Sequence, residues 1–235
     1  MLAPLGKRAE LYRGHDPRDV PAYTVGEVSR LTGVCRSTLA SWVHGQKGSV
    51  PVIGTHGEDG GYVSFMALAE LHVLAALRRH HRISLQKIRT AIKYIADMAD
   101  SGHPLLDLPL KTDGVSLFVD YLGDLIDCSK RGQIGMKQVL DAYLERIERD
   151  ERGPQRLYPF TRDLRSDTQL EREPRLIVID PRIAFGQPVI AGTRIRTSII
   201  NERFRAGESA TELAKDYGRG LREIEEALRC EGKAA

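Results

Sequence analysis

The stretch AYTVGEVSRLTGVCRSTLASWVHG, residues 22–45, decides the fold of the N-terminal part of the chain. Thr24 is suited to cap a first helix, and Glu27, three residues later, completes a capping box. Gly33 ends that helix, and a second helix runs from about Arg36 to His44. Each helix has one apolar face at helical spacing, formed by Val25, Val28 and Leu31 in the first and by Leu39 with Val43 or Trp42 in the second. The pattern predicts a helix-turn-helix.

The outward face of the second helix is suited to DNA. In a helix-turn-helix, the N-terminal residues of the second helix enter the major groove. Here they include an arginine and several hydroxyl side chains, and the helix contains no acidic residue that would repel phosphates. The residues expected to point outward are Arg36, Ser37, Thr38, Ser41 and His44. An ordinary helical hairpin that binds no DNA is the alternative.

A wing and a pair of helices follow. The β-prone runs Val50–Ile53 and Tyr62–Phe65 flank a glycine-rich turn and predict a hairpin. Two helices come next, the second beginning at Ser84. Their inward residues are expected to be Leu68, Leu71 and Leu74 or Ala75, and then Leu85, Ile88, Ile92 and Ile95. The adjacent His80 and His81 point about 100° apart on a helix, so no metal site is predicted there.

Residues 22–96, with this order of parts, resemble the winged helix-turn-helix of the MerR regulators. The resemblance implies that the second helix enters the major groove and that the wing contacts the DNA backbone. Together with His44 of the outward face, the DNA-binding residues implied are Arg36, Ser37, Thr38, Ser41, Lys47, His56 and Tyr62. The sequence departs from the family where an arginine commonly follows the wing tyrosine, because Val63 stands there.

Composition limits the class of protein. A chain of 235 residues is long enough for more than one compact unit. The net charge is +3, but residues 1–100 carry 13 basic and 9 acidic side chains, whereas the remainder carries 22 and 23. An anionic partner is therefore expected at the N-terminal part. No membrane span or secretion signal is recognised, which predicts a cytoplasmic location. The widely spaced cysteines, Cys35, Cys128 and Cys230, are expected to be ordinary reduced thiols.

The middle of the chain is predicted to contain a β-hairpin and a helix. Residues 103–131 alternate apolar and polar side chains around Thr112–Gly114, which indicates a hairpin turn. A helix is expected over Met136–Asp150, and "RLYPF", residues 156–160, is a strand candidate. Residues 161–175 are strongly charged and predict an exposed linker. The acidic residues of this region form no pattern that indicates a nuclease.

The segment GQPVIAGTRIRT, residues 186–197, does not have the spacing of a phosphate-binding loop. Its glycines instead separate strands expected at Leu176–Ile179, Pro188–Ile190 and Thr193–Ile195. Three helices follow at Ser198–Ala206, from Ser209 to Tyr217 and at Leu221–Arg229, with Ile199, Ile200, Phe204, Ile224, Ala227 and Leu228 inward. The last helix presents Glu223, Glu225 and Glu226, so we expect this second helix-turn-helix to contact protein rather than DNA.

Residues 180–229 resemble a family of uncharacterised domains numbered four hundred and thirty-three, whose hallmark Gly-x-Pro-Val-Ile-x-Gly-Thr-Arg-Ile corresponds to Gly186–Ile195. That family is encoded beside PIN-like ribonuclease toxins, and a chain that joins it to a MerR-like head resembles the VapB antitoxins. The resemblance implies contact with a VapC-type toxin, whose acidic site an arginine would approach. The candidate toxin or dimer contacts are Arg162, Arg165, Gly186, Pro188, Gly192, Thr193, Arg194 and Arg196. Arg194 can equally anchor the strand turn.

The sequence therefore predicts an α+β protein: a mainly helical winged helix-turn-helix, a β-hairpin and helix middle region, and a small C-terminal domain of strands and three helices. The expected parts are an N-terminal arm (1–21), the DNA-binding domain (22–100), the middle region (101–160), a charged linker (161–175) and the C-terminal domain (176–235). The expected function is that of a non-enzymatic antitoxin and repressor. It would bind operator DNA and a VapC-type toxin, and form a homodimer and a hetero-oligomer with the toxin, without a cofactor, metal or membrane partner. The alternatives are an effector-responsive MerR-type regulator without a toxin, and an enzyme such as a nuclease.

Overall fold

The computed structural model describes residues 12, 14–45, 51–53, 61–81, 83–99, 102–107, 114–162 and 173–232 of the 235-residue chain. Its first elements are strand β1 (Tyr23–Thr24), helix α2 (Val25–Thr32) and helix α3 (Arg36–His44). The predicted capping box at Thr24 and Glu27 is present, and Gly33 ends α2 in the left-handed conformation, with φ of 68°. The core faces agree with the prediction, since Val28, Leu31, Leu39, Trp42 and Val43 are all buried.

The strand pairing next to the helix-turn-helix differs from the predicted wing. Strand β2 (Tyr62–Val63) pairs antiparallel with β1, so that Tyr23 lies opposite Val63 and Thr24 opposite Tyr62. Within the described residues, 51–53 form no strand; instead, the Trp42 carbonyl accepts from the Val52 and Ile53 amides, and Ile53 is buried. Phe65, expected at the end of the second wing strand, instead begins the next helix, and Val50 and residues 54–60 lie outside the described residues. Strand β2 therefore pairs with the start of the helix-turn-helix. In this arrangement the Val63 side chain is buried in the same core as Tyr23.

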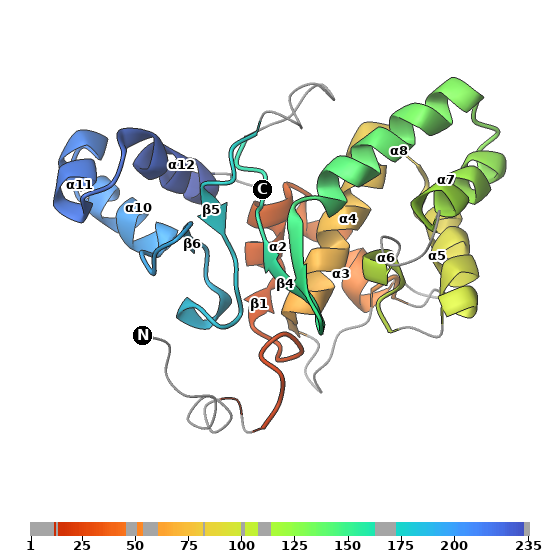
Figure 1. Ribbon diagram of the computed structural model, residues 1–235, viewed down its shortest axis with the longest axis horizontal. Helices are drawn as coiled ribbons and strands as arrows, with labels where there is room; N and C mark the ends of the chain where they lie inside the picture. Colours follow the sequence, from red (N-terminus) through yellow and green to blue (C-terminus); the bar gives the residue numbers. More distant parts are fainter. Residues whose placement is uncertain are drawn as a thin grey trace.

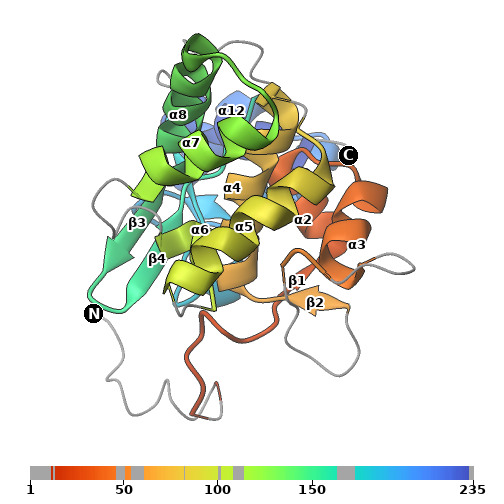
Figure 2. The same ribbon diagram turned by 90° about the vertical axis from the view of Figure 1, so that its right-hand side faces the viewer.

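The two helices predicted after the wing are α4 (Phe65–His81) and α5 (Leu85–Ala99). Helix α4 is buried on several sides and contacts both α2 and α8 (Lys130–Leu144). Its residues Leu68, Leu71, Leu74 and Ala75 are all fully buried, as expected, as is Ile88 of α5. Helix α4 is thus the central element that joins the helix-turn-helix to the middle of the chain, as Figures 1 and 2 both show.

The hairpin predicted within residues 103–131 is wrong. The described residues there form helices α6 (Pro104–Asp107) and α7 (Gly114–Leu125). Phe118, Val119 and Leu122 recur at helical spacing and are buried, and α7 packs against α5 and α8. The apparent alternation was compatible with either structure, and contacts with distant helices decided between them.

The hairpin of the middle region instead consists of β3 (Ile147–Asp150) and β4 (Gly153–Leu157). The predicted helix over Met136–Asp150 therefore begins earlier and ends at Leu144. The segment ERGPQ, residues 151–155, forms the hairpin turn and the start of β4, with Gly153 at φ of 109°. The Leu157 and Ile179 backbones exchange hydrogen bonds of 3.0 and 2.9 Å, which attaches the hairpin to the C-terminal domain.

The C-terminal domain contains strands β5 (Ile177–Val178) and β6 (Val189–Ile190), a short 3-10 turn η2 (Ala184–Gly186), and helices α10 (Thr197–Arg205), α11 (Ala210–Tyr217) and α12 (Leu221–Gly232). β5 and β6 are antiparallel, and the capping box at Ser209 and Glu212 is present. The strand expected at Thr193–Ile195 is absent from these described residues, although Val189 and Arg196 form one bridge. The prediction that Phe204 is buried is wrong: it is 45% exposed, and the buried residues of α10 are Thr197 and Ile200.

In Figure 1 the N-terminal elements occupy the middle of the molecule, α5, α7 and α8 lie on one side, and α10, α11 and α12 lie on the other. The C-terminal domain therefore lies against the helix-turn-helix rather than at the far end of the chain. Among the described residues, no helix combines the length and apolar character that a membrane span requires.

Candidate nucleic-acid interface and partner surface

The helix-turn-helix is stabilised by its own hydroxyl groups. The Ser29 hydroxyl donates to the Val34 carbonyl at 2.6 Å, and the Thr32 hydroxyl donates to the Val28 carbonyl at 2.7 Å. Both side chains are buried, so these bonds satisfy polar groups that would otherwise be costly. The turn between α2 and α3 is thus rigid, and it fixes which face of α3 points outward.

Figure 2 shows α2, α3, β1 and β2 together at one side of the molecule. On α3, Arg36, Ser37 and His44 are exposed, and Thr38 and Ser41 are partly exposed. Tyr62 is 53% exposed on β2, opposite Thr24 at the start of α2. The structure therefore brings six of the eight predicted DNA contacts to the helix-turn-helix surface. Lys47 and His56 lie outside the described residues.

Two side chains of this group are oriented by local contacts. The Arg36 guanidinium lies over α2, since a methyl group added at Gly26 would be 3.3 Å from its central carbon. The Ser41 hydroxyl donates to the Thr38 carbonyl at 2.7 Å. Arg36 is therefore placed where α2 and α3 meet, with its charge exposed. The Ser41 hydroxyl, in contrast, already uses its hydrogen in a bond to the helix backbone.

Cys35, immediately before α3, belongs to this surface, although the sequence indicated only an ordinary thiol. It is exposed and occupies the N-cap position, with its Sγ 2.9 Å from Thr38 Oγ1 and 3.5 Å from Ser37 Oγ. The hydrogen bond from Thr38, then that from Ser37, lowers the pKa of Cys35 to about 7. The sequence contains a signal for this lowered pKa, because Cys35 stands one residue before a helix whose first turn contains the hydroxyls of Ser37 and Thr38.

The acidic residue nearest to this surface in sequence, Glu27, is engaged elsewhere. Its Oε2 accepts from the Thr24 amide and hydroxyl, both at 2.8 Å, and its Oε1 accepts from Gln187 Nε2 at 3.4 Å. The carboxylate is thus held in the capping box rather than presented next to Arg36. The exposed side of α3 remains cationic and hydroxylic, which suits phosphates and base edges.

The glycine hallmark of the C-terminal domain contacts the helix-turn-helix directly. The Tyr23 hydroxyl donates to the Gly186 carbonyl at 3.0 Å, and both residues are buried. Burial raises the pKa of Tyr23, which keeps its hydroxyl neutral as a donor. Tyr12 of the N-terminal arm donates to the Pro181 carbonyl at 2.9 Å. The hallmark is therefore the contact between the two domains.

The end of α12 makes the second contact with α2. Arg30 forms an ion pair with Glu231, and its Nη1 lies 3.5 Å from the Cys230 carbonyl. The other oxygen of Glu231 accepts from the hydroxyl of the buried Thr197 at the start of α10. One carboxylate thereby joins α2, α10 and α12.

The predicted partner residues of the hallmark fall into two groups. Gly186 and Pro188 are buried; Gly186 joins the two domains through Tyr23, whereas the Pro188 carbonyl accepts from the Thr197 amide at 3.0 Å within the C-terminal domain. Gly192, Arg194 and Arg196 are exposed. Thr193 closes the turn through bonds with the Ile190 carbonyl and Ile195 amide, at 2.8 and 3.0 Å.

Arg162 is part of an intrachain network rather than an isolated cation. It lies 2.8 Å from Glu226 Oε1 and 3.8 Å from Glu173 Oε2, and the Thr161 hydroxyl bonds to both carboxylates at 3.2 and 3.0 Å. Glu226 is completely buried, so the prediction that it faces outward on α12 is wrong. Residues 161 and 173, expected in an exposed linker, are buried too, and Arg165 lies outside the described residues.

Next to this network lies a buried arginine that the sequence did not single out. It joins residues 158–159 to residues 173–174 through hydrogen bonds to their carbonyls. Arg146 is 3% exposed and donates to the carbonyls of Tyr158, Glu173, Pro159 and Pro174, at 2.8, 2.9, 3.3 and 3.0 Å. Burial lowers its pKa to about 10. Its guanidinium also lies 4.7 Å from the centre of the Phe160 ring.

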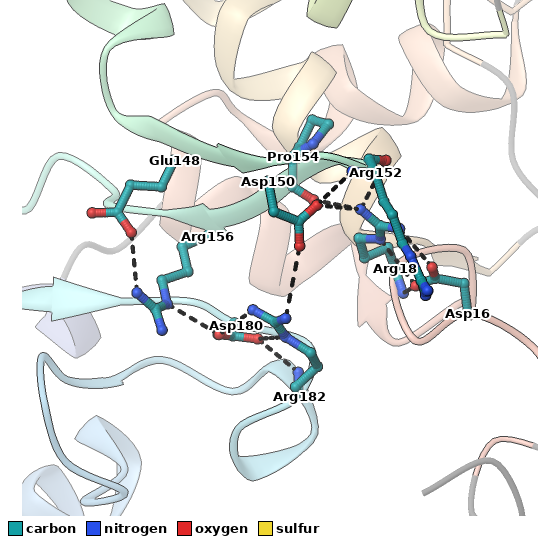
Figure 3. Close-up of polar contacts among 9 residues, drawn as sticks. All are labelled: Asp16, Arg18, Glu148, Asp150, Arg152, Pro154, Arg156, Asp180 and Arg182. Carbon is teal, nitrogen blue, oxygen red and sulfur yellow. Dashed lines mark hydrogen bonds and ion pairs between the residues drawn. The ribbon is translucent and has the colours of Figure 1, made fainter. Parts of the chain in front are cut away.

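Figure 3 shows a ladder of alternating charges that joins the N-terminal arm, the β3–β4 hairpin and the start of the C-terminal domain. Its order is Asp16, Arg18, Asp150, Arg182, Asp180, Arg156 and Glu148, with neighbours 2.6, 3.4, 3.8, 3.1, 3.1 and 3.2 Å apart. Asp180 is buried and accepts from both arginines beside it. Each carboxylate is paired with arginine, and the part of the chain that the structure describes contains no group of three metal-ligating side chains.

Comparison with known families agrees with this division of the chain. Residues 21–92 match the family described as "Putative DNA-binding HTH domain", and residues 177–229 match "Protein of unknown function (DUF433)". The chain thus combines a helix-turn-helix domain at its N-terminal side with a DUF433 domain at its C-terminal side, and the middle region lies between them. The predicted helix-turn-helix and the resemblance to family four hundred and thirty-three are both confirmed.

Relatives extend the likeness over most of the chain. It is 28% identical to the Mycobacterium tuberculosis protein named "Putative antitoxin VapB45", over 89% of this chain and 93% of that protein. It is 26% identical to the "Uncharacterized protein Rv2308" of the same organism, over 89% and 90%. The crystal structure of Rv2018 from Mycobacterium tuberculosis has a TM-score of 0.65 and 26% identity, over 89% of this chain and 98% of that one. The similarity therefore includes the middle region.

Proposed function

We propose that this protein is the antitoxin of a type II toxin–antitoxin system, which neutralises a PIN-like VapC ribonuclease toxin and represses its own operon. One observation carries the proposal: a helix-turn-helix and a DUF433 domain pack together in a chain that is 28% identical, over 89% of its length, to the protein named "Putative antitoxin VapB45". A DNA-binding regulator and a partner-binding domain are the two parts that this function needs.

For the DNA-binding part, we propose operator contacts from Arg36, Ser37, Thr38, Ser41, His44 and Tyr62, together with Lys47 and His56. The observations in favour are the exposure of α3 and the engagement of Glu27 in its capping box. A helix-turn-helix reads a two-fold symmetric operator with two copies, so the protein would act as a homodimer.

For the toxin-binding part, we propose that Arg194 and Arg196 approach the acidic metal site of the toxin. Both are exposed, and neither forms an ion pair with an acidic side chain among the described residues. Arginine suits this role because its planar group binds carboxylates in a bidentate manner and stays charged. We propose no catalytic role for the chain itself, since the acids of its charge ladder are paired with arginines.

Co-expression with the product of the adjacent gene tests the proposal. The expected result is that the adjacent product stops growth, and that this chain restores growth and purifies with it. A variant with Arg194→Ala and Arg196→Ala should lose rescue, whereas Arg205→Ala with Arg222→Ala, two exposed arginines of the same domain, should retain it. Absence of both toxicity and a complex would refute the antitoxin function and leave a DNA-binding regulator.

Operator binding is tested separately by footprinting the promoter of the same operon. We expect a protected site with two-fold symmetry that depends on Arg36. A protein that leaves this promoter unprotected does not repress its own operon.

A further inference from the structure

The turn between β5 and β6 has an unusual backbone. Ala184, Phe185 and Gly186 have φ angles of 49°, 56° and 78°, so three consecutive residues are left-handed. Glycine adopts this conformation readily, but for other residues the Cβ comes too close to the carbonyl oxygen. For a bulky residue such as phenylalanine it is a genuine outlier.

Phe185 gains no burial from this strain. Its side chain is 64% exposed, the largest fraction among the exposed large apolar residues that the structure describes. If Phe185 served only to fill the core, its side chain would be buried. If the turn had no binding function, a glycine at this position would give the same backbone conformation without strain. Strained residues at defined positions are characteristic of binding sites.

The turn is also rigid. The Ile183, Gly186 and Gln187 amides donate to the carbonyls of Asp180, Ile183 and Ala184, at 2.8, 3.0 and 3.1 Å. At its base, the buried Asp180 is held by Arg156 and Arg182, as Figure 3 shows. At its other end, the Gly186 carbonyl accepts from the buried Tyr23 hydroxyl. The position of Phe185 is therefore fixed before any partner arrives.

We propose that Phe185 is the anchor residue of a protein interface, and that it inserts into an apolar pocket of the partner bound by the C-terminal domain. The assignment rests on the proposed function, because it deepens the toxin contact. A rigid aromatic side chain loses little entropy on binding, and such residues dominate interface energies. DNA is a poorer fit, since the neighbouring Arg182 is paired with Asp180 and Asp150 and offers no unpaired charge to phosphates.

The test measures the affinity of variants for the purified product of the adjacent gene. Phe185→Ala should weaken binding at least about thirtyfold, the loss expected for an interface hot spot. Phe185→Leu should recover part of the affinity by retaining apolar bulk. Phe204→Ala is the matched control, because Phe204 is 45% exposed on an ordinary helix of the same domain; its effect should stay below about threefold.

A second measurement tests the strain. Phe185→Gly and Phe185→Ala remove the same side chain, but only glycine relieves the backbone, so the glycine variant should unfold about 2 to 8 °C above the alanine variant. Equal unfolding temperatures would overturn the proposal, as would normal partner binding by Phe185→Ala. If the unaltered chain does not bind the adjacent product, the proposed function fails and this assignment fails with it.

Discussion

Replacing Gly186 with alanine tests whether the glycine hallmark holds the two domains together. The added Cβ would lie 2.2 Å from the Tyr23 hydroxyl oxygen, well inside van der Waals contact. Tyr23 is 1% exposed and has no room to move aside. The substitution also places a Cβ on a residue with φ of 78°.

The expected loss of stability has two parts. A non-glycine residue in the left-handed region costs about 1 to 2 kcal/mol. Displacing the Tyr23 hydroxyl leaves a buried donor and the Gly186 carbonyl unpaired, which costs about 1 to 3 kcal/mol more. The free energy of unfolding should therefore fall by about 2 to 5 kcal/mol, with a decrease of roughly 4 to 20 °C in the unfolding temperature for a chain of this size.

Gly192 provides the matched control. Its φ of 76° is nearly the same, but a Cβ added there meets nothing within 4 Å. Gly192→Ala should thus show only the backbone cost, about 1 to 2 kcal/mol. Urea and thermal unfolding followed by circular dichroism would measure both variants. Equal losses for the two would refute the reasoning, because they would mean that the contact with Tyr23 contributes nothing.

Three further predictions concern single residues. Arg36→Ala should weaken operator binding and reduce the slope of its salt dependence by about one, whereas Arg222→Ala should not; an unchanged slope would show that Arg36 contacts no phosphate. Operator affinity should fall as the pH rises through about 7, because the Cys35 thiolate then repels DNA and DNA in turn raises its pKa. Fluorescence anisotropy below and above that pH should show the decline, and Cys35→Ser should remove it; an equal decline in both would exclude the thiol. Arg146→Met should lower the free energy of unfolding by about 3 kcal/mol, since it leaves four carbonyl acceptors without their donor; a stability unchanged in urea unfolding would contradict this.

The parts of the fold that local chemistry determines could be predicted from the sequence. The capping boxes at Thr24 and Ser209 depend on residues three positions apart, and both helices begin where the sequence indicated. The prediction of a hairpin before Leu125 was wrong because local sequence did not determine the structure there. Its apolar residues fit a strand or a helix, and the choice depended on α5 and α8, whose positions a single segment does not encode.

The candidate site shows the same limit. The outward face of α3 follows from helical spacing, so Arg36 and Ser37 were found. Glu226 was assigned to the wrong side because a glutamate on an amphipathic helix is normally exposed. In the structure the buried carboxylate is paired with Thr161 and Arg162, which lie 65 and 64 residues earlier in the chain. Phe185 was missed because its importance lies in a backbone angle, which sequence periodicity does not report.

The contacts between the domains place the DUF433 domain on α2, the helix that supports α3, which we propose to read DNA. Glu27 and Arg30 are three residues apart on α2 and so lie on one side of that helix, and Tyr23 precedes them on β1. Each bonds to the C-terminal domain: Tyr23 to Gly186, Glu27 to Gln187, and Arg30 to Glu231. The orientation of α2 is therefore set by both domains at once. Because the Gly33 turn fixes α3 relative to α2, the position of the proposed DNA-binding face depends on the docked C-terminal domain as well as on its own core.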